Sequence, residues 1–346
     1  MSQIPSKHMP KTMDDFAQAC GVSRPTLSKY FENPDSVKAT TRTRIELKLI
    51  ETGYQPNLYA RNLNRKRVRT VGIIVPSITD PFYAQLVTRV ELILRNASYW
   101  PVTISAHGRR DLETEALRTL RSLKAGGALI APLGYASDAE AFAQFTNEVP
   151  CIFLDNTITS GVPYVGNDNT QSVGVMMDYL CRSGHPPVYL DTPEVNPGSS
   201  ERRNAYLTAS AMHGVMPLVL PHDDPANEWD LERAGYERMV KLIRSGLPRP
   251  TVLCANDRLA IGALAAAFAA GLKVGHAPGC DLRIAGHDDH PLSRYSAPSL
   301  TTMAQDYEKM AQTACDLLLQ VVEGRIAPAD IRTTKLPGRL VMRSSA

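Results

Sequence analysis

Near its start the chain carries apolar residues with the spacing of an α-helix. One helical face, at positions i, i+3, i+4 and i+7, holds Met13, Phe16, Ala17 and Cys20. Thr12 can cap the beginning of this helix. Gly21 can end it, because glycine adopts a left-handed backbone conformation without steric cost. The pattern therefore predicts a short amphipathic helix followed by a tight turn.

A second helix is expected directly after this turn. Ser23 can act as its N-cap, and Leu27 and Phe31 can pack against the first helix. The residues that then point outward are Arg24, Pro25, Ser28 and Lys29. A short helix with exposed cations suits the major groove of DNA, where Arg and Lys pair with guanine. From these residues alone, a small helical hairpin with a solvated polar face is an equally good interpretation.

A third helix is expected from about Thr40 to Thr52, with Gly53 at its end. Residues 56–69 follow as a short potential helix and a basic tract. A run of charge is most often a solvated linker. A helix this short does not persist alone in water, but it can fold when it docks on DNA. Both interpretations of this segment stay open on the residues alone.

The hydrophobic pattern changes at Thr70. Val71–Val75 is a continuous apolar run, which is typical of a buried parallel strand. Further strands alternate with helical patterns through Leu154, and a second such series begins near Tyr164. This alternation predicts a doubly wound parallel sheet, so two consecutive series predict two α/β halves. A cleft between such halves is a common ligand site, because the carboxyl ends of the strands converge there.

The charge of the chain is unevenly distributed. The 346 residues together carry a formal net charge of +3. Residues 1–69 contain 13 Lys and Arg against 6 Asp and Glu, a net charge of +7, so the remainder carries −4. A basic head on a mildly acidic body indicates that the head meets a polyanion and the body does not.

Several function classes lack their sequence signatures. The chain has no nucleophile elbow, phosphate-binding glycine loop or metal-spaced cluster of His and Cys, so neither an enzyme nor a metal site is expected. The six cysteines are scattered, which favours reduced thiols. No apolar run reaches the roughly 18 residues of a membrane span, and no signal peptide is evident, so a cytoplasmic protein is expected.

Several short motifs follow one another along the chain, and their order is a more specific signal than any one of them alone. It comprises Asp15–Ser23, Gly53–Asn57 with Ala60–Leu63, Val71–Pro76 with Asp80–Tyr83, Val165–Asn169, Ala255–Asp257 with Ala260–Leu264, Gly286–Asp289 and Pro298–Thr302. Together these motifs resemble the lactose repressor (LacI/GalR) family of bacterial transcription regulators. The resemblance implies an all-α helix-turn-helix head and an α/β core like that of periplasmic binding proteins, made of two doubly wound parallel-sheet subdomains.

The resemblance also implies domain boundaries. The DNA-binding head covers residues 1–55, and a hinge helix with its linker covers residues 56–69. The first core half covers residues 70–163 and 296–326, and the second covers residues 164–295 and 327–346. Such a protein binds a pseudo-palindromic operator as a homodimer, or as a tetramer made of dimers.

Matching positions imply which residues contact DNA. Those in the head are Arg24, Pro25, Thr26, Ser28 and Lys29. Arg24, Pro25 and Lys29 match base-reading positions. Thr26 and Ser28 match phosphate-contacting positions. Those in the hinge are Asn57, Ala60, Arg61 and Leu63. Leu63 matches a leucine that the family wedges into the minor groove, where an apolar wedge unstacks a base step and bends the DNA.

Further matches imply an effector site in the cleft. Its residues are Asp80, Phe82, Tyr83, Asp155, Arg202, Trp229, Asn256, Asp288 and Gln305. Carboxylates, an Asn and an Arg beside aromatic rings suit a sugar, whose hydroxyls need donors and acceptors and whose apolar faces stack on rings.

The sequence therefore predicts a transcription repressor whose operator affinity is set by a small polar effector, a mono- or disaccharide, with no other cofactor. A purine or a sugar phosphate is the alternative effector. A sugar-binding transport protein is the alternative from another class, but it would have no use for a basic head. The sequence does not indicate whether the effector releases DNA or is needed to bind it.

Overall fold

The computed structural model describes residues 10–55, 68–158, 163–220 and 229–346. It divides the chain into two compact units, Met1–Val68 and Arg69–Ala346, which are called the head and the core below. Each unit has its own buried apolar residues.

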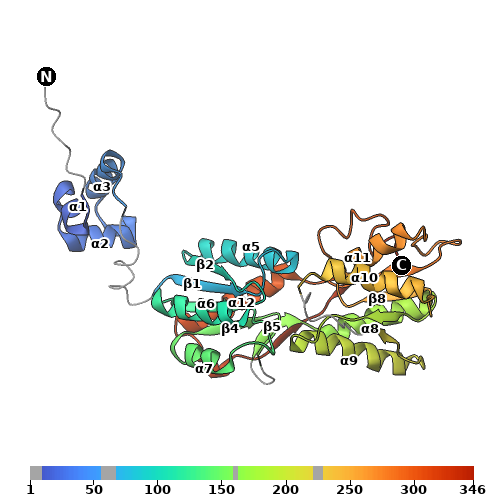
Figure 1. The fold of residues 1–346 in the computed structure, drawn as a ribbon. Helices are drawn as coiled ribbons and strands as arrows, with labels where there is room; N and C mark the ends of the chain where they lie inside the picture. The colour runs from blue at the N-terminus through green and yellow to red at the C-terminus, as the bar shows by residue number, and fades with distance from the viewer. Residues whose placement is uncertain (1–9, 56–67, 159–162, 221–228) are drawn as a thin grey trace. The chain divides into compact units, whose positions relative to one another are not determined.

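The described part of the head, residues 10–55, is a small three-helix unit. Its elements are α1 (Met13–Cys20), α2 (Arg24–Glu32), a 3-10 turn at Pro34–Ser36 and α3 (Ala39–Thr52) (Figure 1). Thr12 forms a capping box with Asp15 at the start of α1, and Gly21 ends that helix with φ = 60°. The Ser23 side chain accepts a hydrogen bond from the Thr26 amide at the start of α2. The three expected helices and the caps of the first two are thus confirmed.

The core of the head is built around Phe16. Leu27, which was expected to pack against the first helix, and Ile45 of α3 are fully buried with it. Tyr54, which the helical pattern did not single out, stacks on the Phe16 ring with 4.3 Å between ring centroids. Tyr30 is buried as well. This aromatic packing gives a very small unit much of its apolar contact area.

The first half of the core is a six-stranded parallel sheet in the order β11-β5-β4-β3-β1-β2. Its strands are β1 (Thr70–Val75), β2 (Trp100–Ser105), β3 (Gly127–Ile130), β4 (Cys151–Leu154), β5 (Tyr164–Asn167) and β11 (Thr334–Leu336). Helices α5 (Pro81–Asn96) and α12 (Tyr307–Val322) pack on one face of this sheet. Helices α6 (Arg110–Ser122) and α7 (Ala139–Glu148) pack on the other. Because successive strand side chains alternate, Ile73 lies on the first face and Ile74 on the second.

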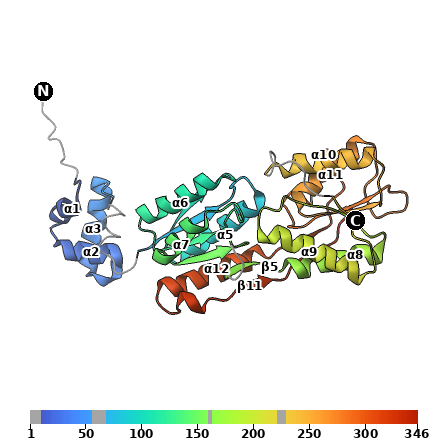
Figure 2. The same cartoon turned by 60° about the horizontal axis from the view of Figure 1, so that its bottom comes forward.

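The second half is a four-stranded parallel sheet in the order β7-β6-β8-β9. Its strands are β6 (Val188–Leu190), β7 (Val219–Leu220), β8 (Thr251–Cys254) and β9 (Arg283–Ala285). Figures 1 and 2 show α8 (Asn169–Ser183) and α9 (Pro197–Met212) together on one side of this half, and α10 (Leu231–Arg244) and α11 (Asp257–Ala269) on the other. A short antiparallel pair, β10 (Thr302–Ala304) and β12 (Arg339–Val341), and a 3-10 turn at Pro328–Asp330 complete the core.

The α/β architecture agrees with the expectation, but the division between the halves does not. β5 and β11 were expected in the second half, yet β5 pairs with β4 and β11 pairs with β5 in the first sheet. Leu300 and Met303 were expected in the first half, yet they pack in the hydrophobic core of the second. The expected boundaries at residues 164, 296 and 327 are therefore wrong. Among the elements that the structure describes, the chain crosses between the halves after β5, between β10 and α12, and between β11 and β12.

Within the described ranges, no helix is both long enough and apolar enough to cross a membrane.

Candidate effector cleft and DNA-contacting helix

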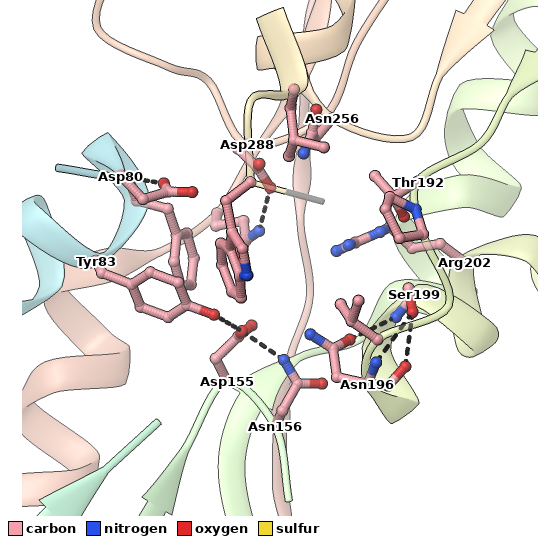
Figure 3. A pocket seen from close by; sticks show the side chains of 16 residues that line it. Asp80, Tyr83, Asp155, Asn156, Thr192, Asn196, Ser199, Arg202, Asn256 and Asp288 are labelled. Carbon is pink, nitrogen blue, oxygen red and sulfur yellow. Dashed lines mark hydrogen bonds between the residues drawn. The ribbon is translucent and has the colours of Figure 1, made fainter. Parts of the chain in front are cut away.

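A polar cleft lies between the two halves of the core. Its volume is about 80 Å³, and residues from both halves line it (Figure 3). All nine residues expected at the effector site are among its lining residues. The lining residues that the sequence did not single out are Asn156, Thr192, Pro193, Val195, Asn196, Ser199 and Leu231.

The first half supplies aromatic rings and two carboxylates. Asp80 is the N-cap of α5, and its side chain accepts a hydrogen bond of 2.9 Å from the Phe82 amide. The Phe82 and Tyr83 rings meet edge to face, with 4.9 Å between their centroids. The cap therefore fixes the first turn of α5, and that turn presents both rings to the cleft.

Asp155 follows β4 and has a positive φ of 61°. The Tyr83 hydroxyl donates to its Oδ2 atom at 3.1 Å, and the Asn156 side-chain amide donates to the same atom at 2.6 Å. Burial raises the pKa of Asp155 to about 6, although the nearby Arg202 opposes the shift. The carboxylate is thus held by neutral donors in a site where its charge is costly.

The second half supplies amides, a carboxylate and a guanidinium. Asn256 is the N-cap of α11; its Oδ1 atom accepts from the Leu259 amide at 2.9 Å, which leaves the side-chain NH2 group for the cleft. The Asp288 Oδ1 atom accepts from Gln305 at 2.6 Å and lies 3.0 Å from His287 Nδ1. These contacts fix the direction of the Asp288 carboxylate.

Three buried polar atoms at the cleft have no hydrogen-bond partner among the described residues. They are Thr192 Oγ1, Arg202 Nε and Gln305 Oε1. Figure 3 shows the Arg202 side chain reaching from α9 into the cleft. A buried polar atom without a partner costs free energy, so such a group is expected to be satisfied by a ligand or by ordered water.

Five of the seven missed lining residues lie between the end of β6 and the first turn of α9, whereas Asn156 follows β4 and Leu231 begins α10. Thr192 and Pro193 follow the carboxyl end of β6, and Asn196 caps α9 in a capping box with Ser199. The sequence contains a signal for Asn196 and Ser199, since Asn-Pro-Gly-Ser is a helix-start pattern. None of the short motifs that resemble the LacI/GalR family lies in this loop, so its residues were not among the expected site residues.

In the head, α2 presents the expected polar face. Arg24, Pro25, Ser28 and Lys29 are exposed, whereas Thr26 is half-buried and its hydroxyl lies 2.8 Å from that of Ser23. The Arg24 guanidinium lies 3.4 Å from the Asp14 carboxylate. The expected hinge contacts Asn57, Ala60, Arg61 and Leu63 lie outside the described residues.

In the part of the chain that the structure describes, no group of three or more His, Cys, Asp or Glu side chains is placed to hold a metal ion.

Two family models match the chain in the two units. The model for bacterial regulatory proteins of the lacI family matches residues 12–57, and that for the periplasmic binding protein-like domain matches residues 177–346. A curated relative is the HTH-type transcriptional repressor CytR of Escherichia coli strain K12. It is 30% identical over 317 residues, which are 91% of this chain and 90% of the relative.

Solved structures agree with these matches. The lac repressor dimer bound to operator and the anti-inducer ONPF aligns with a TM-score of 0.84 at 26% identity, and covers 97% of this chain and 99% of that one. A LacI family transcriptional regulator from Enterococcus faecium with bound ribose aligns with a TM-score of 0.68 at 25% identity, and covers 80% of this chain and 98% of that one. These relatives regulate transcription and are not enzymes. The chain belongs to the lacI family of bacterial regulatory proteins, and it is a DNA-binding transcriptional repressor.

Proposed function

We propose that a neutral polyhydroxylated molecule of monosaccharide size binds in the cleft and controls the affinity of this repressor for its operator. The observation that carries the proposal is the set of unpaired buried polar atoms on Thr192, Arg202 and Gln305, three residues that line a cleft together with aromatic side chains. Sugar hydroxyls satisfy donors and acceptors together, and the apolar faces of a sugar ring pack on aromatic side chains.

The charges at the cleft favour a neutral ligand over a sugar phosphate. Among the lining residues, Arg202 is the cation, and the carboxylates of Asp155 and Asp288 are close enough to interact with its charge. The third lining carboxylate, Asp80, is already paired with Arg258. An anionic phosphate would therefore meet two carboxylates for one available guanidinium, and like charges in a poorly solvated site repel strongly.

The volume of the cleft favours a small ligand. A cavity of about 80 Å³ holds roughly six water molecules if each needs about 10–15 Å³. A disaccharide or a purine nucleoside would need the two halves to move apart. The bound ribose of the Enterococcus faecium relative is a pentose, so D-ribose is the first compound to test.

We assign the operator contacts to α2 and the hinge, in a homodimer. Arg24, Pro25 and Lys29 would face base edges, and Thr26 and Ser28 would contact phosphates. The exposed polar face of α2 supports this assignment, since a helix N-terminus with cations can enter a major groove. The hinge residues Asn57, Ala60, Arg61 and Leu63 would lie in the minor groove. A two-fold dimer would match a pseudo-palindromic operator. The lac repressor, a relative in structure, is a dimer when bound to its operator.

The first test is thermal unfolding of the full chain with D-ribose, other monosaccharides, sugar phosphates and purines. A ligand at 100 times its Kd stabilises the folded protein by about 2.7 kcal/mol, which raises the unfolding midpoint. Asp288→Ala should abolish this shift and leave operator binding intact, with the operator obtained by selection from random duplex DNA. Asp316→Ala is the matched control, because Asp316 is exposed on α12 and contacts Gln312.

A midpoint raised by a neutral sugar, together with a change in operator affinity, would support the proposal. A midpoint raised only by a sugar phosphate or a purine would overturn the choice of ligand class and leave the repressor function in place. An unchanged shift in Asp288→Ala would remove this carboxylate from the site.

A further inference from the structure

Among the described residues, two ion pairs join the halves of the core: Lys335–Glu201, between β11 and α9, and the more buried Arg258–Asp80, at the edge of the cleft. Arg258, the second residue of α11, belongs to the second half, and Asp80 belongs to the first. The Arg258 Nη1 atom lies 3.0 Å from Asp80 Oδ2, and the two side chains are only 15% and 13% exposed. A pair this buried is screened far less by water and salt than a surface pair.

Arg258 is itself firmly held within the second half. Its Nε atom donates to Glu232 Oε1 at 2.8 Å, and its Nη2 atom donates to Glu232 Oε2 at 2.6 Å. Nη2 also donates to the Trp229 carbonyl at 2.9 Å. The planar guanidinium therefore has one edge fixed, and its remaining Nη1 atom is aimed at Asp80. Burial disfavours the charge, but the carboxylates of Glu232 and Asp80 outweigh it and raise the pKa of Arg258.

A second contact across the cleft lies beside this ion pair. Gly108, in the loop after β2 of the first half, has a φ of 70°. A Cβ atom at Gly108 would lie 2.4 Å from Trp229 Nε1, so the indole occupies the space that a side chain would fill. Since Arg258 also binds the Trp229 carbonyl, one arginine positions both contacts.

We infer that Arg258 is a positioning residue that holds the cleft closed, by tying the ligand-facing Asp80 of the first half to Glu232 and Trp229 of the second. The two halves have separate hydrophobic cores. An interaction between them therefore biases opening and closing of the cleft more than folding of either half.

The inference rests on the proposed function in one respect, because it takes the cleft as the place where the effector acts. Asp80 and Trp229 line the cleft and also take part in the closure contacts. A ligand that touches either residue is then linked to closure. The first half begins at β1, the strand that follows the hinge in the chain. A movement of this half would therefore also move the residue at which the chain leaves the hinge.

The test uses intrinsic fluorescence and needs no ligand. The chain has two tryptophans, and Trp100 is 53% exposed on the surface of the first half. A Trp100→Phe background leaves Trp229 as the reporter of the cleft edge. Acrylamide quenching of Trp229 is then measured in Arg258→Gln, in Asp80→Asn and in the double variant.

We expect each single variant to shift the ratio of open to closed molecules toward the open form by about tenfold, because removing one partner leaves the other charge uncompensated. Quenching of Trp229 should rise accordingly. The double variant should be quenched no more than Arg258→Gln alone, because Asp80 acts on the cleft only through Arg258. Asp80→Asn is the stricter variant, since Asp80 does not bind Trp229 and Asn can still cap α5.

Arg121→Gln is the matched control, because the Arg121–Glu148 ion pair lies entirely within the first half. Unchanged quenching in Asp80→Asn, or an additive effect in the double variant, would overturn the inference. If Arg258→Gln fails to fold, Asp80→Asn alone decides the question. Failure of every sugar to alter operator binding would count against the proposed function, but it would leave the quenching result intact.

Discussion

Asp155 shows how one residue can make effector binding depend on pH. Burial raises its pKa to about 6, and in the ionised form it can accept hydrogen bonds from ligand hydroxyls. As the pH falls through about 6, the carboxyl gains a proton and loses part of this acceptor capacity. The affinity for the sugar identified by thermal unfolding should therefore be highest above pH 6 and should fall below it, by at most about tenfold per pH unit.

Calorimetric titration from about pH 5 to pH 8 measures this profile. Asp155→Asn cannot titrate, so its profile should lack the step near pH 6. Asp316→Ala, which lies outside the cleft, should keep the step. If the step persists in Asp155→Asn, another group is responsible, and Asp155 is a structural partner of Tyr83 and Asn156.

At the scale of the residue, the sequence predicted some of the residues that line the cleft and missed others. Arg202, Asn256 and Asp288 were found because they lie at matched positions, and the structure brings them together in one cleft. Thr192 was missed, although its hydroxyl is among the unpaired atoms that carry the proposal. A Thr after a three-residue strand has no distinctive pattern, and only the topology shows that this strand ends at the cleft.

At the scale of the element, α1 shows how a few local contacts stabilise a small unit. The Thr12 hydroxyl accepts from the Asp15 amide at 3.1 Å, and the Asp15 carboxylate accepts from the Thr12 amide at 3.0 Å. Removing an N-cap of this kind costs about 1 kcal/mol, or about fivefold faster hydrogen exchange in the helix if it opens locally. Thr12→Ala should show this acceleration across α1 in hydrogen exchange of the full chain.

Thr43→Ala is the control for this substitution. Thr43 lies exposed inside α3, where its hydroxyl donates to the Ala39 carbonyl at 3.1 Å. Ala is the better helix former at such a position, so exchange in the head should be unchanged or slower. Equal acceleration in the two variants would show that the capping box of α1 has no special role.

The helices and the long apolar strands were predictable at this scale, but the short strands were not. Caps and amphipathic spacing define α1 and α2, and the apolar run of β1 marks a central strand. β11 has three residues, Thr334–Leu336, and only Leu336 is buried. Its place beside β5 comes from long-range pairing, which local periodicity cannot reveal.

At the scale of the whole molecule, the charge separates the DNA-binding unit from the effector-binding unit. Residues 1–69 carry a net charge of +7, and the rest of the chain carries −4. Binding of the head to DNA releases counterions from the phosphates, so operator affinity should fall steeply with salt. The acidic remainder repels the phosphates and so opposes non-specific binding of the core to DNA, which leaves the head as the part of the chain that binds DNA.

Lys29 is the residue on which this view is best tested, because a lysine can contact either a base or a phosphate. It is exposed on α2, one turn from the half-buried Thr26. If Lys29 contacts a base edge, Lys29→Ala should weaken binding to the selected operator by about 1–3 kcal/mol and relax specificity at one base position. Binding to random DNA should change much less.

Fluorescence anisotropy with operator and random duplexes, measured over a range of salt concentrations, separates the two roles. Lys48→Ala is the control, because Lys48 lies on α3 and pairs with Glu51 at 2.7 Å. If Lys29→Ala instead weakens both duplexes equally and lowers the salt slope by about 1, the lysine contacts a phosphate. Base recognition by α2 would then rest on Arg24, whose guanidinium would have to leave Asp14 to reach the groove.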